Sequence, residues 1–412
     1  MRVSNSMLAR ISNAALMKRQ EDIANVQSEI ASGLRLQKPS DNPTGTAQKI
    51  DQETAIAQIE QYNRNISMGQ SRLQSAETSI AAVTDALQRA RELALSAANA
   101  TNSSNEHRAM ASELTQIQSS VYSVANGKDS SGNYLFSGTE VKTQPFTGNS
   151  NVSYNGNSES RTIQARNNLL IDTSFSGADV FLDIPNSTNS HTISTQQTNT
   201  GSTVVLLDGQ DETQNSTTYT LEFTDANSYR ILNNTDGSEV IPTTATPESG
   251  EINFNGLQIT LEGNAAAGDT FQINPTENQS VFTTFQNFID ALNASVDSST
   301  GKAKLRQTVN ETLTALDTTL DSLNTQRSLI GTRLQTTDTV KSENEFTVFQ
   351  LQETLAEIKD TDLTDAISRL QEHTLALQVL QQTTVRTQSL SCLLYTSPSP
   401  RDQRGSRMPS SA

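Results

Sequence analysis

Cysteine is almost missing from this chain of 412 residues, which holds a single one, Cys392, near its C-terminal end. A disulfide bond and a zinc site of the cysteine type therefore lack the residues that they need. The three histidines, His107, His191 and His373, are far apart, and none has a second histidine four residues on or lies in an HExxH context. We expect them on the protein surface or on helix faces, and we predict no metal site and no cofactor.

Basic residues are outnumbered, since 29 Lys and Arg against 45 Asp and Glu give a formal net charge of −16. Such a chain repels nucleic acid and anionic lipid, so we predict neither as a partner. The sequence contains no run of about 18 apolar residues, so we predict no membrane-spanning helix. The start, MRVSNSMLARISNAALMKRQ, lacks the apolar stretch of a signal peptide. We expect a protein that stays in the cytoplasm or leaves by a route that reads no such peptide.

Proline is missing between Pro43 and Pro145, and apolar residues recur there in heptads. Two series interleave at spacings of three and four, which predicts a coiled-coil seam on a helix from about 44 to 100. Asn42 can cap this helix, and Pro43 suits its first position. After the breaker ATNSSNE, a second helical seam follows. The series are Ile59, Ile66, Leu73, Ile80, Leu87, Ala94; Tyr62, Gly69, Ala76, Val83, Ala90; and Met110, Leu114, Ile117, Val121, Val124.

The C-terminal part of the chain is patterned in the same way. A short amphipathic helix is predicted around 281–292, a heptad seam around 309–334, and a last amphipathic helix after KDTDLTD, capped by Asp360 or Thr361. The apolar positions are Val281, Phe285, Phe288, Leu292; Val309, Leu313, Leu316, Leu320, Leu323, Ile330, Leu334; and Ile358, Leu363, Ile367, Leu370, Leu377, Leu380. Periodicity alone leaves open whether these seams close a bundle within one chain or pack against other molecules.

Residues 130–278 are instead rich in Thr, Asn, Gly and Ser and contain short alternating strands. Tyr219, Leu221 and Phe223 share one strand face, and Asn255-Gly256 predicts a tight hairpin. The stretch NNTDGSE (233–239) indicates a hairpin turn rather than a calcium loop. The predicted fold is therefore α+β: a long antiparallel, coiled-coil-like helical bundle rod built from both chain ends, with an inserted β-rich domain.

Several stretches, in order along the chain, resemble the bacterial flagellins and the junction proteins related to them. They are SGLRLQKPSDNPTG (32–45), GKDSSGNYLFSGTEVKTQPF (127–146), GADVF (177–181), GDTFQINP (268–275), IGTRLQTTD (330–338) and DTDLTDAISRLQEHTLALQVLQQTTVRTQSLS (360–391). The KPSDNP form and the GNYLF segment are similar to the hook-associated protein 3 branch of this family rather than to flagellin itself. The resemblance covers nearly all of residues 1–391.

The resemblance implies a structural adaptor, not an enzyme, at the hook–filament junction of the extracellular bacterial flagellum. Its implied partners are the first hook–filament junction protein, flagellin, further copies of itself in a ring, and an export chaperone. It also implies export through the flagellar type III apparatus without a signal peptide. The terminal segments, 1–45 and 360–391, would be disordered in the monomer and fold into paired helices on assembly.

The amphipathic patterns of these two terminal segments supply a mechanism. A lone amphipathic helix is marginal in water and gains stability when a neighbour covers its apolar face. We therefore predict an assembly interface, with an intramolecular core as the alternative. Its predicted residues are Val3, Leu8, Ile11, Leu16, Ile23, Val26, Ile30, Leu34, Leu363, Ile367, Leu370, Leu377 and Leu380.

Three other functions compete with the junction adaptor. A flagellin filament subunit would share both chain ends. A flagellin-like hydrolase would need a catalytic constellation within 130–278, where His191 is the one histidine and the aspartates are scattered. An adhesin that binds glycan through the β insertion would need an aromatic platform, and no aromatic cluster marks one.

The final stretch, Ser389–Ala412, is foreign in composition to the helix before it. CLLYTSPSPRD corresponds to one reading frame of a widely used transposon-based sequencing adapter, and SRMPSSA corresponds to its constant outer end. We interpret 392–412 as a sequencing-adapter artefact and expect it to be irregular and unpacked. The remaining domains are predicted as an N-terminal assembly segment, 1–45; two halves of the helical rod, 46–180 (with a β extension) and 276–359; an inserted β-rich domain, 181–275; and a C-terminal assembly helix, 360–391.

Overall fold

The computed structural model describes residues 5–99, 101–148, 152–187, 190–196, 198–208 and 216–395. The chain divides into two compact units. The central unit consists of residues 61–344, and the terminal unit combines 1–60 with 345–412. Helices α2 (Pro43–Ala97) and α6 (Ser299–Lys359) each contribute residues to both units.

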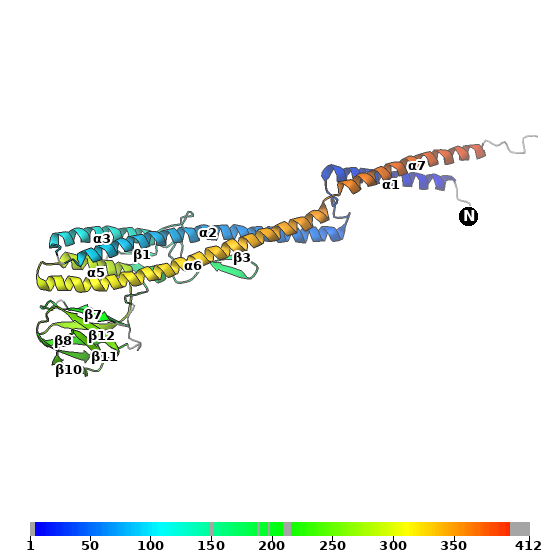
Figure 1. Ribbon diagram of the computed structural model, residues 1–412. Coiled ribbons are helices and arrows are strands. Elements are labelled where there is room, and N and C mark those ends of the chain that lie inside the picture. The colour runs from blue at the N-terminus through cyan, green and yellow to red at the C-terminus, as the bar shows by residue number, and fades with distance from the viewer. Residues whose placement is uncertain are drawn as a thin grey trace, which may run out of the picture. The chain divides into compact units, whose positions relative to one another are not determined.

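The central unit contains a bundle of α2, α3 (Ser104–Ala125), α5 (Val281–Ala294) and α6 (Figure 1). Helices α2 and α6 run antiparallel, because their salt bridges join Arg91 to Asp317 at 2.6 Å and Glu77 to Arg327 at 2.8 Å. Most of the apolar positions predicted for these helices are buried. Those with at most 1% of their surface exposed are Ile66, Leu73, Ala76, Ile80, Val83, Leu87, Ala90, Ala94, Leu114, Val121, Val281, Phe285, Phe288, Leu292, Val309, Leu316, Leu323 and Ile330.

The helix starts follow from local sequence signals. Asn42 accepts a hydrogen bond from the Gly45 N–H at 2.9 Å, and Pro43 is the first residue of α2, as predicted. Ser103 caps α3 in a capping box with Glu106, which explains why ATNSSNE separates two helices. In this box Glu106 accepts hydrogen bonds from the backbone N–H and the side chain of Ser103, and they lower its pKa.

One seam position of α2, Gly69, has a particular role. It is buried, and a Cβ atom there would lie 2.5 Å from Cδ1 of Ile163. Glycine in the middle of a helix costs about 1 kcal/mol relative to alanine. Here it lets the hairpin of β3 (Thr162–Arg166) and β4 (Leu169–Asp172) approach the helix backbone.

The segment between α3 and the β-rich insertion packs onto the bundle through aromatic side chains. Phe136 of the GNYLF stretch is fully buried and meets Phe181 edge-to-face at 5.2 Å between ring centroids. Phe146 is also fully buried and contacts Phe282 of α5 at 5.6 Å. The short elements in this segment are β1 (Phe146–Thr147), β2 (Ser153–Tyr154), α4 (Gly177–Phe181) and β5 (Ile184–Pro185).

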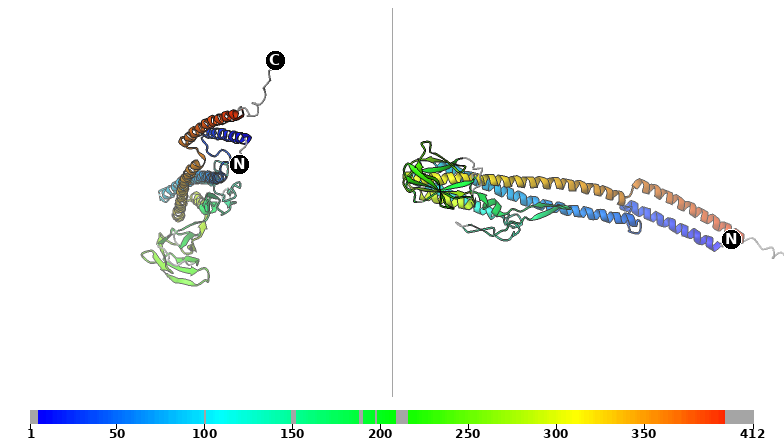
Figure 2. Two further views of the ribbon diagram at one scale, coloured as in Figure 1. Left: turned by 90° about the vertical axis from the view of Figure 1, so that its right-hand side faces the viewer. Right: turned by 90° about the horizontal axis from the view of Figure 1, so that it is seen from below.

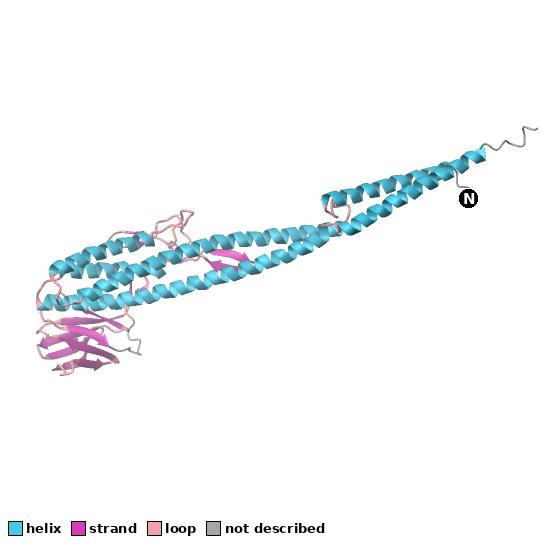
Figure 3. Ribbon diagram, turned by 45° about the horizontal axis from the view of Figure 1, so that its top comes forward, coloured by secondary structure: helices cyan, strands magenta, loops and turns pink. Residues whose placement is uncertain are grey.

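The insertion consists of two antiparallel sheets that share one core (Figure 3). The five-stranded sheet has the order β10-β9-β8-β13-β6, and the three-stranded sheet has the order β11-β12-β7. The strands are β6 (His191–Thr195), β7 (Val204–Asp208), β8 (Tyr219–Asp225), β9 (Ser228–Asn233), β10 (Glu239–Ala245), β11 (Glu251–Phe254), β12 (Leu257–Glu262) and β13 (Thr270–Pro275); β14 (Asn278–Gln279) pairs with β5.

The predicted hairpins of this insertion are confirmed. Phe254 pairs with Leu257 across a turn in which Asn255 and Gly256 have φ of +45° and +84°. Positive φ at both central residues is the geometry that suits the right-handed twist of a hairpin. The NNTDGSE stretch joins β9 to β10 as a turn. The predicted face of Tyr219, Leu221 and Phe223 lies in the core, with at most 1% exposure.

In the terminal unit, α1 (Asn5–Ser32) and α7 (Leu363–Tyr395) lie side by side (Figure 2). Helix α7 continues through Tyr395, so residues 392–395 are helical where we predicted irregular chain. Leu393 and Leu394 favour helix, and the first helix-breaking proline of this stretch, Pro398, follows later. The rest of the predicted artefact, 396–412, lies outside the described residues.

The predicted fold class, helices from both chain ends with an inserted β-rich domain, is confirmed. The apolar seams of the helices between residues 61 and 344 pack mainly against one another within the chain. Among the helices that the structure describes, none combines the length and the apolar character that crossing a membrane requires.

Candidate assembly interface

Helices α1 and α7 of the terminal unit form an antiparallel pair along one seam. Its centre is tight, with Val26 at 4% and Ala366 at 0% exposure. The other apolar seam residues, Leu16, Ile23, Ile30, Leu370, Leu377 and Leu380, are half-buried. A small residue such as alanine lets two helix backbones come close, and longer side chains then cover the seam on either side.

Polar contacts fix the register of this helix pair. Arg369 of α7 donates to Glu29 of α1 at 2.9 Å and to Asp365 on its own helix at 2.8 Å. Arg19 of α1 lies 3.1 Å from Nδ1 of His373. These contacts join residues 340 and 354 positions apart, so they hold the two ends of the chain to each other.

Backbone hydrogen bonds join the segment that follows α1 to the segment between α6 and α7; we call these contacts the backbone bridge. Gly33, with φ of +71°, ends α1, and its carbonyl accepts from the Thr361 N–H at 2.9 Å. The Arg35 N–H donates to the Lys359 carbonyl at 2.7 Å. The Arg35 guanidinium also donates to the carbonyls of Glu357 and Ile358, both at 2.9 Å. These carbonyls belong to the last turn of α6, where they have no partner within the helix.

Helix α7 begins at a cap that differs from the predicted one. We predicted Asp360 or Thr361, but the cap is Asp362, whose carboxylate accepts from the Thr364 N–H at 2.8 Å. Hydrogen bonds from the N–H groups of Asp365 and Thr364 lower the pKa of Asp362. The cap lies one or two residues later than predicted because Asp360 and Thr361 pair with Leu34 and Gly33 in the backbone bridge.

The structure brings together part of the predicted interface. The paired seam contains Leu16, Ile23, Val26, Ile30, Leu370, Leu377 and Leu380, and Leu34 lies in the bridge opposite Asp360. Ile11, Leu363 and Ile367 are instead exposed, at 57%, 51% and 46%. Val3 lies outside the described residues, and of Leu8 only the backbone, within α1, is described.

A second set of apolar residues on these helices was missed by sequence reasoning. Leu375 and Val379 of α7 are 63% and 51% exposed, and Met7 and Met17 of α1 are 53% and 71% exposed. A period of 3.6 residues places Leu375 and Val379 on the side of α7 opposite to Leu377. A helical wheel drawn for every apolar residue, rather than for one apolar face alone, would have found them. We call Met7, Met17, Leu375 and Val379 the outer apolar set.

The histidines of the central unit are buried, although we expected surface or helix-face positions. His107 is 2% exposed and its Nδ1 lies 2.7 Å from Oγ of Ser295, so it does occupy a helix face, but an internal one. His191 is fully buried at the start of β6, with Nε2 3.1 Å from the Thr217 carbonyl. Within the described residues, no cluster of three or more His, Cys, Asp or Glu side chains could hold a metal ion.

Two family models match the chain. Residues 3–141 match the bacterial flagellin N-terminal helical region, and residues 186–275 match the D2-like domain of flagellar hook-associated protein 1. The chain is 27% identical over 184 residues to flagellar hook-associated protein 3 of Salmonella typhimurium, which is 45% of this chain and 58% of that protein. The chain thus matches a little over half the length of this relative.

Solved structures agree with the sequence comparisons. The crystal structure of FlgL from Xanthomonas campestris superposes with a TM-score of 0.69 at 28% identity, covering 74% of this chain and 99% of that one. Flagellar hook-associated protein 3 from Legionella pneumophila gives a TM-score of 0.70 at 28% identity, covering 74% of this chain and 98% of that one. As the KPSDNP and GNYLF motifs predicted, the chain belongs to the hook-associated protein 3 branch of the flagellin family.

Proposed function

We propose that this protein is a structural subunit of the bacterial flagellum, an adaptor at the junction between a hook-side junction protein and the flagellin filament. Two of its relatives are named flagellar hook-associated protein 3, and others are named flagellin. The observation that carries the proposal is the terminal unit. Its two helices pair along one seam and yet keep apolar side chains on their outer sides.

In an isolated terminal unit, the outer apolar set is exposed to water and contributes little to the stability of the unit. A lone pair of helices has marginal stability in water, because each helix covers only one side of the other. Burying a Leu, Val or Met side chain fully contributes about 1.5–3 kcal/mol. Docking of further helices onto Met7, Met17, Leu375 and Val379 would therefore recover several kcal/mol that the monomer leaves unused.

Three further large apolar side chains of the terminal unit are exposed, two on α6 and one on α2. Phe346 and Phe349 are each 62% exposed, and Ile50 of α2 is 55% exposed. Aromatic side chains with this much exposed apolar surface are suited to contacts with another protein. We propose that they pack against neighbouring subunits in the assembled flagellum.

The finer parts of the proposal concern partners, export and domains. The partners are the first hook–filament junction protein, flagellin, further copies in a ring, and an export chaperone. The protein reaches the extracellular flagellum through the flagellar type III apparatus. Segments 1–45 and 360–391 order on assembly, 181–275 forms the inserted domain, and 392–412 is not native sequence.

The test replaces Leu375 and Val379 by Asp together in the full chain. Charges on the outer side of α7 should abolish association with purified flagellin and the first junction protein, measured by co-sedimentation. The circular dichroism spectrum of the monomer should stay the same. A matched control replaces Thr374 and Gln381 by Asp; both are exposed polar residues of the same helix and lie about 100–120° around it from Leu375. Normal association of the Leu375/Val379 variant, or equal loss in the control, would contradict the proposed interface.

Deletion of residues 1–30 separates an assembly segment from a monomer core. We expect the thermal transition of residues 61–344 to keep its midpoint, because the seam partners of α1 belong to α7. A large fall in that midpoint would assign the terminal helices to the monomer core.

The alternative is a flagellin filament subunit. It predicts that the purified chain alone extends filament seeds into long filaments, which electron microscopy would detect. A junction adaptor should bind to the end of a seed without forming a long filament.

A further inference from the structure

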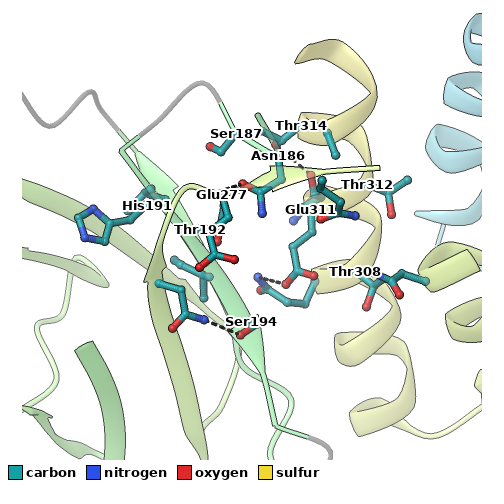
Figure 4. A pocket seen from close by; sticks show the side chains of 18 of the residues that line it. Asn186, Ser187, His191, Thr192, Ser194, Glu277, Thr308, Glu311, Thr312 and Thr314 are labelled. Atoms are coloured by element: carbon teal, nitrogen blue, oxygen red, sulfur yellow. Dashed lines mark hydrogen bonds between the residues drawn. The ribbon is translucent and has the colours of Figure 1, made fainter. Parts of the chain in front are cut away.

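A cleft of about 640 Å³ lies in the central unit, between strands β6 and β7 of the insertion and helices α5 and α6 (Figure 4). Its volume falls within the range of small-molecule sites. Most of its lining carries hydroxyl or amide groups, among them Thr192, Ser194, Asn274, Asn287, Thr308 and Thr312. The cleft is therefore suited to a polar occupant rather than to an apolar one.

One buried side chain, Gln307, organises the wall of this cleft on α6. It is 3% exposed, and its Oε1 accepts a hydrogen bond from the Val205 N–H at the edge of β7 at 3.0 Å. This bond fixes the orientation of the amide, because only the oxygen can accept it. The Nε2 group must then face Glu311, and it donates to Oε1 of Glu311 at 3.1 Å.

Glu311 is thus held as a hydrogen-bond acceptor that faces the cleft. Figure 4 shows its side chain between α6 and the strand that carries Thr192 and Ser194. Among the residues that the structure describes, the cleft lining includes a second carboxylate, Glu277, which is exposed, but no Lys or Arg. Burial raises the pKa of Glu311 to about 7. The carboxylate that faces the cleft therefore has no positive partner among the residues that line it.

We propose that this cleft binds a small organic cation that carries a primary ammonium group, with Glu311 as its counter-ion. An ammonium group has three donors and no acceptor. The Glu311 carboxylate and the hydroxyl oxygens of Ser194 and Thr308 supply acceptors of the matching kind. A partly desolvated charge pair is stabilising where its remaining hydrogen bonds are satisfied. This site is independent of the assembly surface of the terminal unit.

Other ligand classes fit the cleft less well. An anion would be repelled by Glu311 and Glu277. A calcium ion takes six to eight oxygen ligands, several of them carboxylates, whereas Glu311 is the one carboxylate held inside the wall. A neutral polyol could use the hydroxyl and amide groups, but it would leave the charge of Glu311 uncompensated.

The test uses the full chain and 1,4-diaminobutane as the probe, with 1,4-butanediol as the neutral isostere and potassium chloride at equal ionic strength. The diamine should raise the melting temperature of residues 61–344 by about 2–4 °C when its concentration is several times Kd. At pH 7, binding should also release about half a proton per diamine, because the pKa of Glu311 is about 7. Calorimetry in two buffers of different ionisation enthalpy measures this release.

The Glu311→Gln variant should lose the proton release and bind the diamine at least tenfold more weakly. Since this substitution keeps the size of the side chain and removes a buried charge, the variant should fold, which circular dichroism verifies. The matched control is Glu248→Gln, an exposed carboxylate of the same insertion, and it should bind like the original chain. Equal shifts with the diol, unchanged binding by Glu311→Gln, or no binding and no proton release by the original chain would each overturn the proposal.

Discussion

The stability of the central unit should depend on pH through Glu311, in the absence of any ligand. Burial raises the pKa of this carboxyl from 4.5 to about 7. The folded state therefore binds a proton more tightly than the unfolded state does. A raised pKa contributes stability that is fully present below pH 4.5 and is lost as the pH rises to about 7.

The size of the effect follows from the shift. One pKa unit corresponds to about 1.4 kcal/mol, so the full shift corresponds to about 3 kcal/mol. Glu311 is partly open to the cleft, where water screens its charge, so we expect about 1–3 kcal/mol. The Glu311→Gln variant has no charge to desolvate. Its free energy of unfolding should equal that of the original chain at pH 4.5 and exceed it by about 1–3 kcal/mol above pH 7.

Urea unfolding between pH 4.5 and 8 measures this difference. Tyrosine fluorescence and circular dichroism should be followed together, because two compact units can unfold in separate transitions. Only the transition of residues 61–344 should shift, and Glu248→Gln should follow the original chain at every pH. If Glu311→Gln and the original chain differ by a constant amount from pH 4.5 to 8, Glu311 is ionised in the folded state throughout, and the reasoning fails.

Three further predictions concern elements that the sequence signals placed. Leu323→Ala should cost about 2–5 kcal/mol in urea unfolding, because Leu323 is fully buried between helices; a cost below 1 kcal/mol would mean that the bundle is loosely packed there. Asn42→Ala should cost about 1 kcal/mol through the loss of the α2 cap, whereas Asn42→Asp, which can still accept the Gly45 N–H, should restore most of it. Gly256→Val should lower the thermal midpoint of the insertion, since φ of +84° is strained for a β-branched residue; an unchanged midpoint would show that the turn rearranges freely.

The bundle helices and the hairpins were predictable because their signals are local. The heptad series from Ile66 to Ala94 repeats every seven residues, and its positions are fully buried. Asn42-Pro43 and Asn255-Gly256 each specify a backbone conformation within two residues. Such signals can be recognised in a short stretch of sequence, without information about distant parts of the chain.

Part of the candidate interface was predictable for the same reason, and part was not. The amphipathic pattern identified Val26 and Leu377 in the seam of α1 and α7. It did not identify Leu375 and Val379, because whether an apolar residue stays exposed depends on which side of its helix the partner covers. The predicted cap of α7 was wrong by one or two residues because the backbone of Asp360 and Thr361 pairs with Leu34 and Gly33.

The sequence by itself determined the α+β class, the start of α2, the hairpin turns and the family. Only the tertiary structure decided which apolar faces are covered, that His191 is buried, and that Gln307 joins Val205 to Glu311. The hydrogen bond between Val205 and Gln307 joins residues that are 102 positions apart. Local periodicity carries no information about such pairs, since they are set by how the insertion packs onto α6.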